Sequence, residues 1–83
     1  MIEIALFGAL REVDPSAHVS VESAARTVRE LRVDVEALAA AWPSQARALL
    51  SRSAFASTTT ILRDADALPD DGRLALLPPV SGG

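Results

Sequence analysis

Residues 27–42, TVRELRVDVEALAAAW, determine the fold class of this chain. Thr27 and Glu30 have the spacing of a capping box, in which each side chain satisfies a backbone N–H group at the start of a helix. The apolar residues that follow recur every three or four positions, as they do on one helix face: Val28, Leu31, Val35, Leu38 and Trp42. The segment is therefore predicted to form one amphipathic helix that covers an apolar surface.

Pro43 predicts both the end of this helix and the start of another. The residue before a proline is disfavoured in the helical region, so the first helix ends here. Proline also fits the first turn of a helix, and a short second helix is expected to turn three residues inward: Ala46, Leu49 and Leu50.

Two strands are predicted before the helix. Residues 2–7 alternate with a period of two, so that Ile2, Ile4 and Leu6 share one face. Residues 18–21 alternate in the same way, and Asp14-Pro15-Ser16 marks a turn in the loop that joins the two segments. Together they predict a hairpin with a long loop.

Further strands are predicted after the helices. Residues 54–62 are expected to form one strand, because they end in a run of β-branched residues, Thr58 to Ile61. Residues 64–68 are expected to be a loop with a very short strand, and Pro69-Asp70-Asp71-Gly72 predicts a turn. Residues 73–77 are the last predicted strand, with Leu74 and Leu76 on one face and Ala75 and Leu77 on the other.

These elements predict an α+β domain. A hairpin followed by a helix that returns to the same sheet gives a mixed sheet of four to five strands. The main helix, with a short second one, is expected to cover one face of that sheet. Its apolar stripe is expected to lie on the strand faces that carry Ile2, Ile4, Leu6, Leu74 and Leu76, or on the alternate faces of these strands.

The end of the chain is expected to be a free tail. Pro78 and Pro79 have no N–H group to donate to a β-ladder, so they stop the last strand. The predicted division is a domain at residues 1–77 and a flexible tail at 78–83 that ends in Gly82-Gly83. Glycines lack side chains, so this tail can enter a narrow channel of a partner enzyme, which can then act on the terminal carboxylate.

Composition excludes several classes of function. The 83 residues fit one domain, and the absence of cysteine excludes disulfides, thiolate metal sites and cysteine nucleophiles. Because small secreted domains usually need disulfides, an intracellular, cytoplasmic location is favoured. No leader or membrane-spanning run is visible, and the net charge of −3 disfavours binding to nucleic acid or anionic membranes.

The side chains that most often carry catalysis have structural explanations here. His18 lies on the polar face of a predicted strand without a second ligand or base beside it. The acidic pairs Asp64/Asp66 and Asp70/Asp71 lie in turns, where aspartate accepts backbone N–H groups, and no metal site is expected. Residues 58–60 are explained by β-propensity. The terminal carboxylate is therefore the best candidate for chemistry.

Two segments resemble a known family. The ending Leu76-Leu77-Pro78-Pro79-Val80-Ser81-Gly82-Gly83 and the first loop, Phe7-Gly8-Ala9-Leu10-Arg11-Glu12, are similar to those of the MoaD family, the small subunit of molybdopterin synthase. The length and the order of elements agree along the whole chain. The resemblance implies a ubiquitin-like β-grasp fold and a non-catalytic, sulfur-donating subunit.

The resemblance also implies a mechanism and partners. An E1-like adenylyltransferase would use ATP to adenylate Gly83, and a sulfurtransferase would then convert the acyl-adenylate to a thiocarboxylate. The chain itself would bind no cofactor. The large synthase subunit, in a heterotetramer of two small and two large subunits, would receive the tail and pass its sulfur to cyclic pyranopterin monophosphate. The tail-binding residues would be Pro78, Pro79, Val80, Ser81 and Gly82.

The partner interface is expected at Phe7, Arg11 and Leu77. From the residues alone, Phe7 is either a core residue or an interface anchor, and Arg11 pairs with a partner acid or the tail, or is solvated. Three other functions stay open. They are a sulfur carrier for thiamine or cysteine synthesis, a ubiquitin-like protein modifier, and an interaction module with an inert tail.

Overall fold

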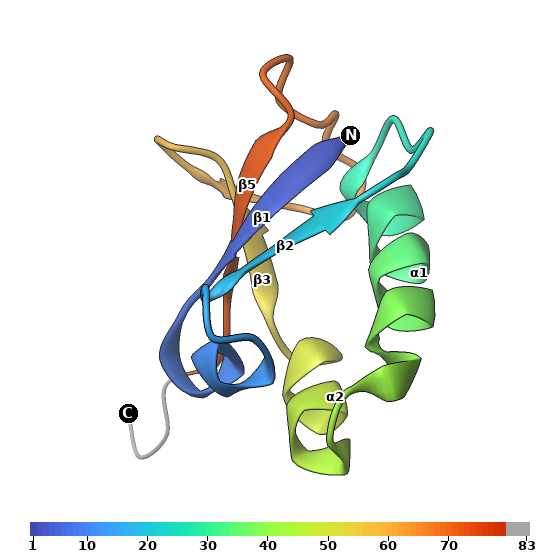
Figure 1. Ribbon diagram of the computed structural model, residues 1–83. Helices are drawn as coiled ribbons and strands as arrows, with labels where there is room; N and C mark the ends of the chain where they lie inside the picture. Colours follow the sequence, from blue (N-terminus) through green and yellow to red (C-terminus); the bar gives the residue numbers. More distant parts are fainter. Residues whose placement is uncertain (80–83) are drawn as a thin grey trace.

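The computed structural model describes residues 1–79, which form a mixed sheet with its helices on one side (Figure 1). The chain order is β1 (Ile2–Leu6), a 3₁₀ helix η1 (Gly8–Val13), β2 (His18–Val21), α1 (Val28–Leu38), η2 (Ala39–Ala41), α2 (Ser44–Leu50), β3 (Ala54–Ala56), β4 (Ile61–Leu62) and β5 (Arg73–Leu77). In space the order is β2-β1-β5-β3-β4. β1 and β5 are parallel, and the other neighbours are antiparallel. The predicted α+β fold is confirmed.

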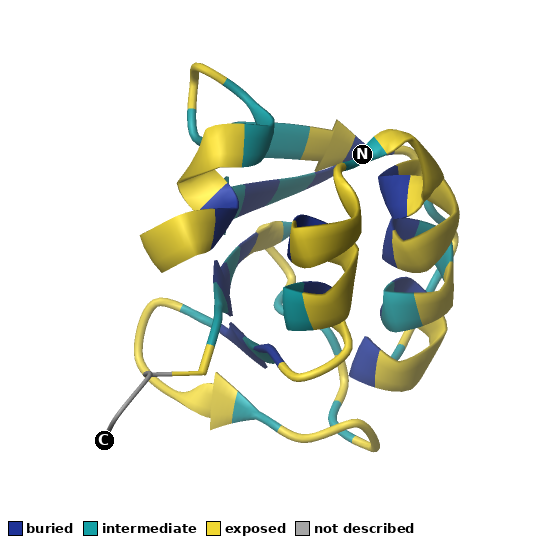
Figure 2. Cartoon of the chain, turned by 90° about the horizontal axis from the view of Figure 1, so that it is seen from below, coloured by how far each residue is buried: buried dark blue, intermediate teal, exposed yellow. Residues whose placement is uncertain are grey.

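The core lies between the sheet and the helices. In the central strands, Ile4 lies beside Leu74, and Leu6 lies beside Leu76. These four side chains are buried, as are Val28, Leu31 and Val35 of α1. Figure 2 shows the buried positions on the inner sides of strands and helices alike. The helix stripe therefore covers the strand faces predicted from the period-two pattern.

A capping box fixes the start of α1, with one shift from the expected geometry. Thr27 Oγ1 accepts a hydrogen bond from the Glu30 N–H at 3.3 Å. Glu30 Oε1 accepts from the Arg26 N–H at 2.7 Å, one residue before the cap, where the usual box would use the cap residue itself. Both ends of the box satisfy N–H groups, so the helix begins at Val28 as predicted.

The end of α1 differs from the predicted stripe. Leu38 is 42% exposed, and Ala39 is buried in its place. The chain tightens into η2 at this point, and a 3₁₀ helix has fewer residues per turn than an α-helix. Leu38 then lies at the border of the apolar stripe, while Trp42 is half-buried against the core.

The prediction of one strand over residues 54–62 was wrong. β3 ends at Ala56 and β4 begins at Ile61, with a turn between them. The Ser57 N–H donates to the Thr60 carbonyl at 2.8 Å, and Ser57 Oγ accepts from the Thr60 N–H at 3.2 Å. The serine side chain offers the backbone a local partner, which favours a turn over the β-propensity of the threonines.

The predicted turns are stabilised by aspartates. Asp66 Oδ2 accepts from the Arg63 N–H at 2.8 Å, and Asp71 Oδ1 accepts from the Arg73 N–H at 3.0 Å. Ala67 forms an isolated bridge with Thr27, which is the very short strand expected in this loop. Among residues 1–79, no helix has the length and apolarity needed to cross a membrane.

Candidate functional site at the base of the tail

The first loop and the end of β5 lie together. The Phe7 N–H donates to the Leu76 carbonyl at 3.3 Å, which carries the β1–β5 ladder past the end of β1. Gly8 follows with φ of +58°, and a Cβ built there would lie 2.8 Å from Pro78 Cγ. At this end of the sheet, η1 folds back beneath β1 and β2 (Figure 1). Its buried Leu10 anchors the loop in the core.

The sequence left two roles open for Phe7, a core residue or an interface anchor, and the structure excludes the first. Phe7 is 47% exposed and is not a core residue. Leu77 is half-buried and pairs with Ala54 of β3, while its neighbour Leu76 faces the core. The outer face of the sheet, opposite the helices, therefore carries exposed apolar surface next to the tail.

The remaining predicted site residues lie around the same point or beyond it. Arg11 is exposed on η1 and makes no ion pair with any residue of the range 1–79. Pro78 is half-buried against Gly8, and Pro79 is exposed. The residues predicted to enter the partner and to carry the sulfur lie outside the described residues: Val80, Ser81, Gly82 and Gly83.

A hollow beside Phe7 was missed by the sequence analysis. It measures about 380 Å³, and its lining includes Ala5, Thr58, Arg73 and Ala75 as well as Phe7. Ala5 and Ala75 are neighbours in the register of β1 and β5, and their small side chains leave room on the outer face. The period-two pattern already placed both alanines on this face. Thr58 was missed because residues 58–60 were predicted to continue the strand.

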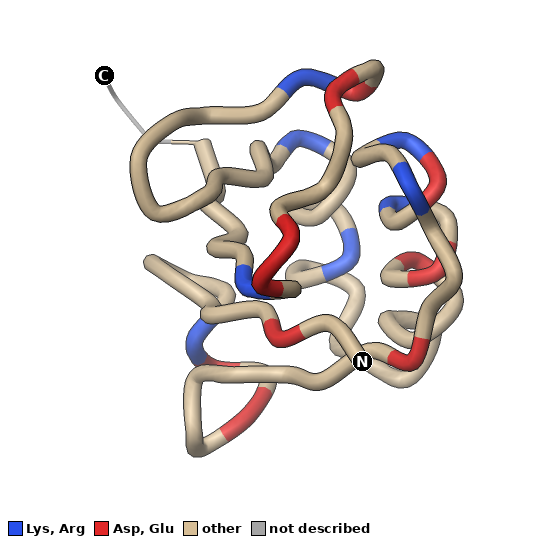
Figure 3. The backbone as a smooth tube through the Cα atoms, turned by 90° about the horizontal axis from the view of Figure 1, so that it is seen from above, with Lys and Arg blue, Asp and Glu red and all other residues tan. Residues whose placement is uncertain are grey.

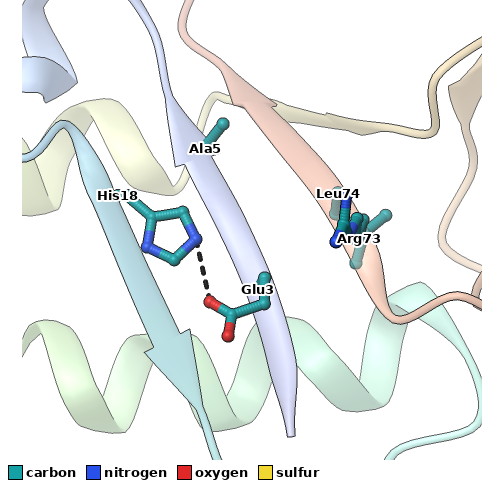
Figure 4. A pocket seen from close by; sticks show the side chains of 5 residues that line it. All are labelled: Glu3, Ala5, His18, Arg73 and Leu74. Atoms are coloured by element: carbon teal, nitrogen blue, oxygen red, sulfur yellow. Dashed lines mark ion pairs between the residues drawn. The ribbon is translucent and has the colours of Figure 1, made fainter.

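The other end of the outer face is polar. Glu3 Oε2 accepts a hydrogen bond from Ser20 Oγ at 2.7 Å and lies 2.8 Å from His18 Nε2. Figure 4 shows His18 and Glu3 pointing toward each other from β2 and β1, with Arg73 on β5 at the other side of Glu3. His18 is thus a partly exposed surface residue with a cross-strand partner. The described part of the chain holds no group of three or more potential metal ligands.

The fold and its comparisons define the class of protein. A five-stranded mixed sheet that holds one main helix on a single face is the ubiquitin-like β-grasp. The chain belongs to the ThiS family, whose model matches residues 4–83 and so extends to the last glycine. It has the fold of ubiquitin-like sulfur carriers and modifiers.

One solved structure supports this assignment over the full length. The crystal structure of SAMP1 from Haloferax volcanii is 28% identical in sequence and superposes with a TM-score of 0.70. The alignment covers 99% of this chain and 98% of SAMP1. A search of curated proteins found no match.

Proposed function

We propose that this chain is the sulfur carrier of molybdopterin synthesis and that its Gly83 carboxylate becomes a thiocarboxylate. The observation that carries the proposal is the match to the ThiS family over residues 4–83, which includes the Gly82-Gly83 ending. The sequence before it, Pro78-Pro79-Val80, and the first-loop pair Arg11-Glu12 favour the molybdopterin branch. In the fold, the first loop lies against the start of the tail at Gly8 and Pro78.

The proposed chemistry needs an activation step on a partner enzyme. A carboxylate oxygen of Gly83 bonds to the α-phosphorus of ATP, and pyrophosphate leaves. A sulfur nucleophile at the oxidation level of sulfide, supplied by a sulfurtransferase, then bonds to the acyl carbon, and AMP leaves. The thiocarboxylate sulfur bonds to a carbon of cyclic pyranopterin monophosphate as a C–O bond at that carbon breaks and the oxygen leaves with the electron pair. Water then cleaves the acyl C–S bond of the resulting thioester, which leaves the sulfur on the pterin and returns the Gly83 carboxylate. Each step uses the main-chain terminus, so a chain without cysteine can perform it.

The β-grasp domain contributes binding and position. We infer that the exposed apolar surface formed by Phe7 and Leu77 docks on the large synthase subunit, and that Arg11 meets an acid there. Docking of a rigid domain holds the thiocarboxylate at the partner's site. The sulfur then reacts from a fixed position, whereas free sulfide would have to meet the acceptor in a bimolecular encounter. The catalytic side chains would belong to the large subunit, in an assembly of two small and two large subunits. Such a carrier would act in the cytoplasm, the location favoured for a small domain without cysteine.

Intact-mass spectrometry tests the covalent step. The chain is incubated with ATP, a sulfur source, an E1-like adenylyltransferase and a sulfurtransferase. The expected product is heavier by the difference between one sulfur and one oxygen atom. Deletion of Gly83 should abolish this product and leave the thermal midpoint unchanged, because the last residue of a chain usually contributes little to folding. Replacing Thr59, an exposed residue of the turn after β3, by alanine is the control and should leave loading intact. Free acid alone, under all conditions, would contradict any carrier function.

The acceptor distinguishes the proposed pathway from the alternatives. Loaded protein is mixed in parallel with the large synthase subunit and cyclic pyranopterin monophosphate, with a thiazole-forming or cysteine-forming enzyme, and with lysine-containing proteins. Dithiolene formation in the first mixture supports the proposal. Sulfur transfer only in the second, or an amide-linked conjugate in the third, would assign the chain to thiamine or cysteine synthesis, or to protein modification.

A further inference from the structure

A second surface of the domain is suited to binding, and it is separate from the tail. It is a groove of about 360 Å³ between the start of β2 and the end of α1. Apolar side chains from η1, β2, α1 and the cap residue after η2 line it: Val13, Val19, Leu38 and Trp42. Leu38 is 42% exposed here, although it is a large apolar residue on the main helix. Leu38 thus contributes exposed apolar surface to the wall of this groove.

One wall of the groove is the open edge of the sheet. β2 is an outer strand, and within residues 1–79 only β1 pairs with it. The Leu6 N–H donates to the Ala17 carbonyl at 2.8 Å, so Ile4–Val19 and Ile2–Val21 are the next hydrogen-bonded pairs of the antiparallel ladder. The N–H and C=O groups of the alternate residues, His18 and Ser20, consequently point away from β1.

These edge groups are available to a further strand. The His18 carbonyl accepts from Ser16 Oγ at 3.1 Å, whereas the N–H groups of His18 and Ser20 and the Ser20 carbonyl have no bond to the described residues. A strand added at this edge would turn every second side chain toward Val19, Leu38 and Trp42. The outward backbone groups of β2 and an apolar groove thus lie side by side. Strand addition uses both, because backbone hydrogen bonds give affinity and side-chain pockets give specificity.

The charge around the edge selects the kind of partner. Residues 12–25 contain Glu12, Asp14 and Glu22 and no arginine or lysine. Figure 3 shows acidic positions at both ends of β2. The imidazole of His18 is engaged by Glu3 at 2.8 Å. Hydrogen bonds from the Ser16 hydroxyl and N–H hold the pKa of Asp14 below its ordinary value, so this carboxylate is charged at neutral pH.

We propose that the β2 edge and this groove bind an extended segment of another protein, with alternating apolar side chains and basic residues at its ends. A second copy of this chain, paired edge to edge, would bring Asp14 and Glu22 against the same acids of its neighbour and is disfavoured. In the sheet this surface is separated from the base of the tail, because β1 lies between β2 and β5, which leads into the tail.

A synthetic peptide tests the proposal. The probe has valine and threonine in alternation and two arginines at each end, and the control peptide has glutamates in place of the arginines. Trp42 is the only tryptophan of the chain, so its fluorescence reports occupancy of the groove. The expected result is saturable binding of the arginine probe, slowed amide exchange at His18 and Ser20, and binding of the glutamate peptide at least about tenfold weaker.

Two pairs of variants separate the edge from the groove. Ser20→Pro removes an outward N–H group without removing a backbone bond to β1, whereas Ser20→Ala keeps that N–H; both variants lose the hydroxyl bond to Glu3. Leu38→Ser removes an apolar wall, and Val33→Ser is its control, because Val33 is 62% exposed on α1 and lies outside this groove. Ser20→Pro and Leu38→Ser should each weaken probe binding by about tenfold or more, while both controls bind as the unmodified chain does.

The outcomes are decisive in either direction. Circular dichroism establishes that each variant is folded, and Leu38→Ser tests the groove without a change to the strand backbone. Equal affinity for both peptides would overturn the proposed charge selection. Amide protection near Phe7 in place of His18 and Ser20 would overturn the proposed location. If the chain forms dimers at higher concentration and amide exchange at Ser20 slows in those dimers without the peptide, a second copy is the occupant. That result would also overturn the proposal.

Discussion

A Cβ atom at Gly8 would lie 2.8 Å from Cγ of Pro78, so these two residues fit together only because residue 8 has no side chain. Gly8 also has φ of +58°, a left-handed conformation that other residues adopt at a cost. The contact joins the start of the first loop to the first residue of the tail. Gly8 therefore helps to set the direction in which the chain leaves β5.

Substitution of Gly8 by alanine should affect both stability and sulfur loading. The left-handed backbone alone is expected to cost about 1–2 kcal/mol, and the new methyl group must displace the Pro78 ring or the loop. If the tail is the substrate of an activating enzyme, its altered direction should slow formation of the thiocarboxylate. Chemical denaturation measures the first effect, and intact-mass time courses measure the second.

Gly72 supplies a matched control for this prediction. Its φ is +67°, and a Cβ there would lie 3.3 Å from the Met1 carbonyl oxygen, at the opposite end of β5 from the tail. Gly72→Ala should lose a similar free energy of unfolding and keep the normal loading rate. Equal slowing in both variants would mean that general destabilisation, and not the Gly8–Pro78 contact, controls activation.

The capping box gives a second stability prediction. Thr27→Ala removes the acceptor of the Glu30 N–H and should lower the free energy of unfolding by about 1 kcal/mol. Thr59→Ala is the control, because Thr59 is exposed in the turn after β3 and should change stability by less than about 0.5 kcal/mol. Urea denaturation compares the two. An equal loss in both variants would contradict a specific role of the cap.

The sequence predicted the elements whose signals are local and periodic. Alternation grouped Ile4 with Leu6, and Leu76 with Leu74, on faces that the structure shows to be buried, and the Thr27 cap set the start of α1. These features depend on neighbouring residues and on one apolar face. The strand expected over residues 54–62 failed because the Ser57 side chain competes for backbone groups, a local bond that propensity does not include.

Part of the candidate site depends on tertiary contacts and was not predictable in detail. Alternation leaves the exposure of Phe7 open, because a strand end can face the core or solvent. A glycine after a strand indicates a possible left-handed residue, but only the fold brings Gly8 against Pro78. Likewise, the exposure of Leu38 follows from the tightening of the chain at η2, which no spacing of apolar residues encodes.

Arg32 is expected to be the most important surface arginine for stability. Its guanidinium donates to the carbonyls of Leu50 at 3.2 Å and Ser53 at 3.1 Å, and it lies 5.1 Å from the ring centroid of Phe55. Arg32→Met should lower the free energy of unfolding by about 2 kcal/mol, because two carbonyls lose a charged donor. Arg32→Lys should recover little, since a single ammonium lacks the planar fork of arginine.

Arg29 is the control for Arg32. It lies on the same helix, is exposed, and has no side-chain hydrogen bond to the described residues. Arg29→Met should therefore change stability by less than about 0.5 kcal/mol. If both methionine variants have calorimetric midpoints close to that of the unmodified chain, the Arg32 hydrogen bonds make no net contribution to stability.

Asp14 should give a pH-dependent contribution to stability. The Ser16 hydroxyl and N–H lower its pKa in the folded chain below the ordinary value of 3.8. A lowered folded pKa stabilises the fold above pH 3.8, and this contribution disappears as the pH falls through the lower folded value. The stability difference between the unmodified chain and Asp14→Asn should thus be constant near neutral pH and shrink in acid. Ser16→Ala should move the Asp14 pKa back toward 3.8 in a carboxyl-carbon NMR titration, and an unmoved pKa would contradict the assigned cause.

Phe7 should matter far more for partner binding than for folding. Its side chain is 47% exposed beside the base of the tail, so Phe7→Ala removes little core surface. If the large synthase subunit docks here, the loss of one aromatic anchor should weaken the complex by about thirtyfold, or about 2 kcal/mol. Ile61→Ala is the control, because Ile61 is 64% exposed on the edge strand β4 at a distance of several strands from β1. Calorimetric titration of both variants measures the difference. Equal weakening would indicate a diffuse apolar contact over the whole outer face, whereas unchanged binding of Phe7→Ala would move the interface away from the first loop.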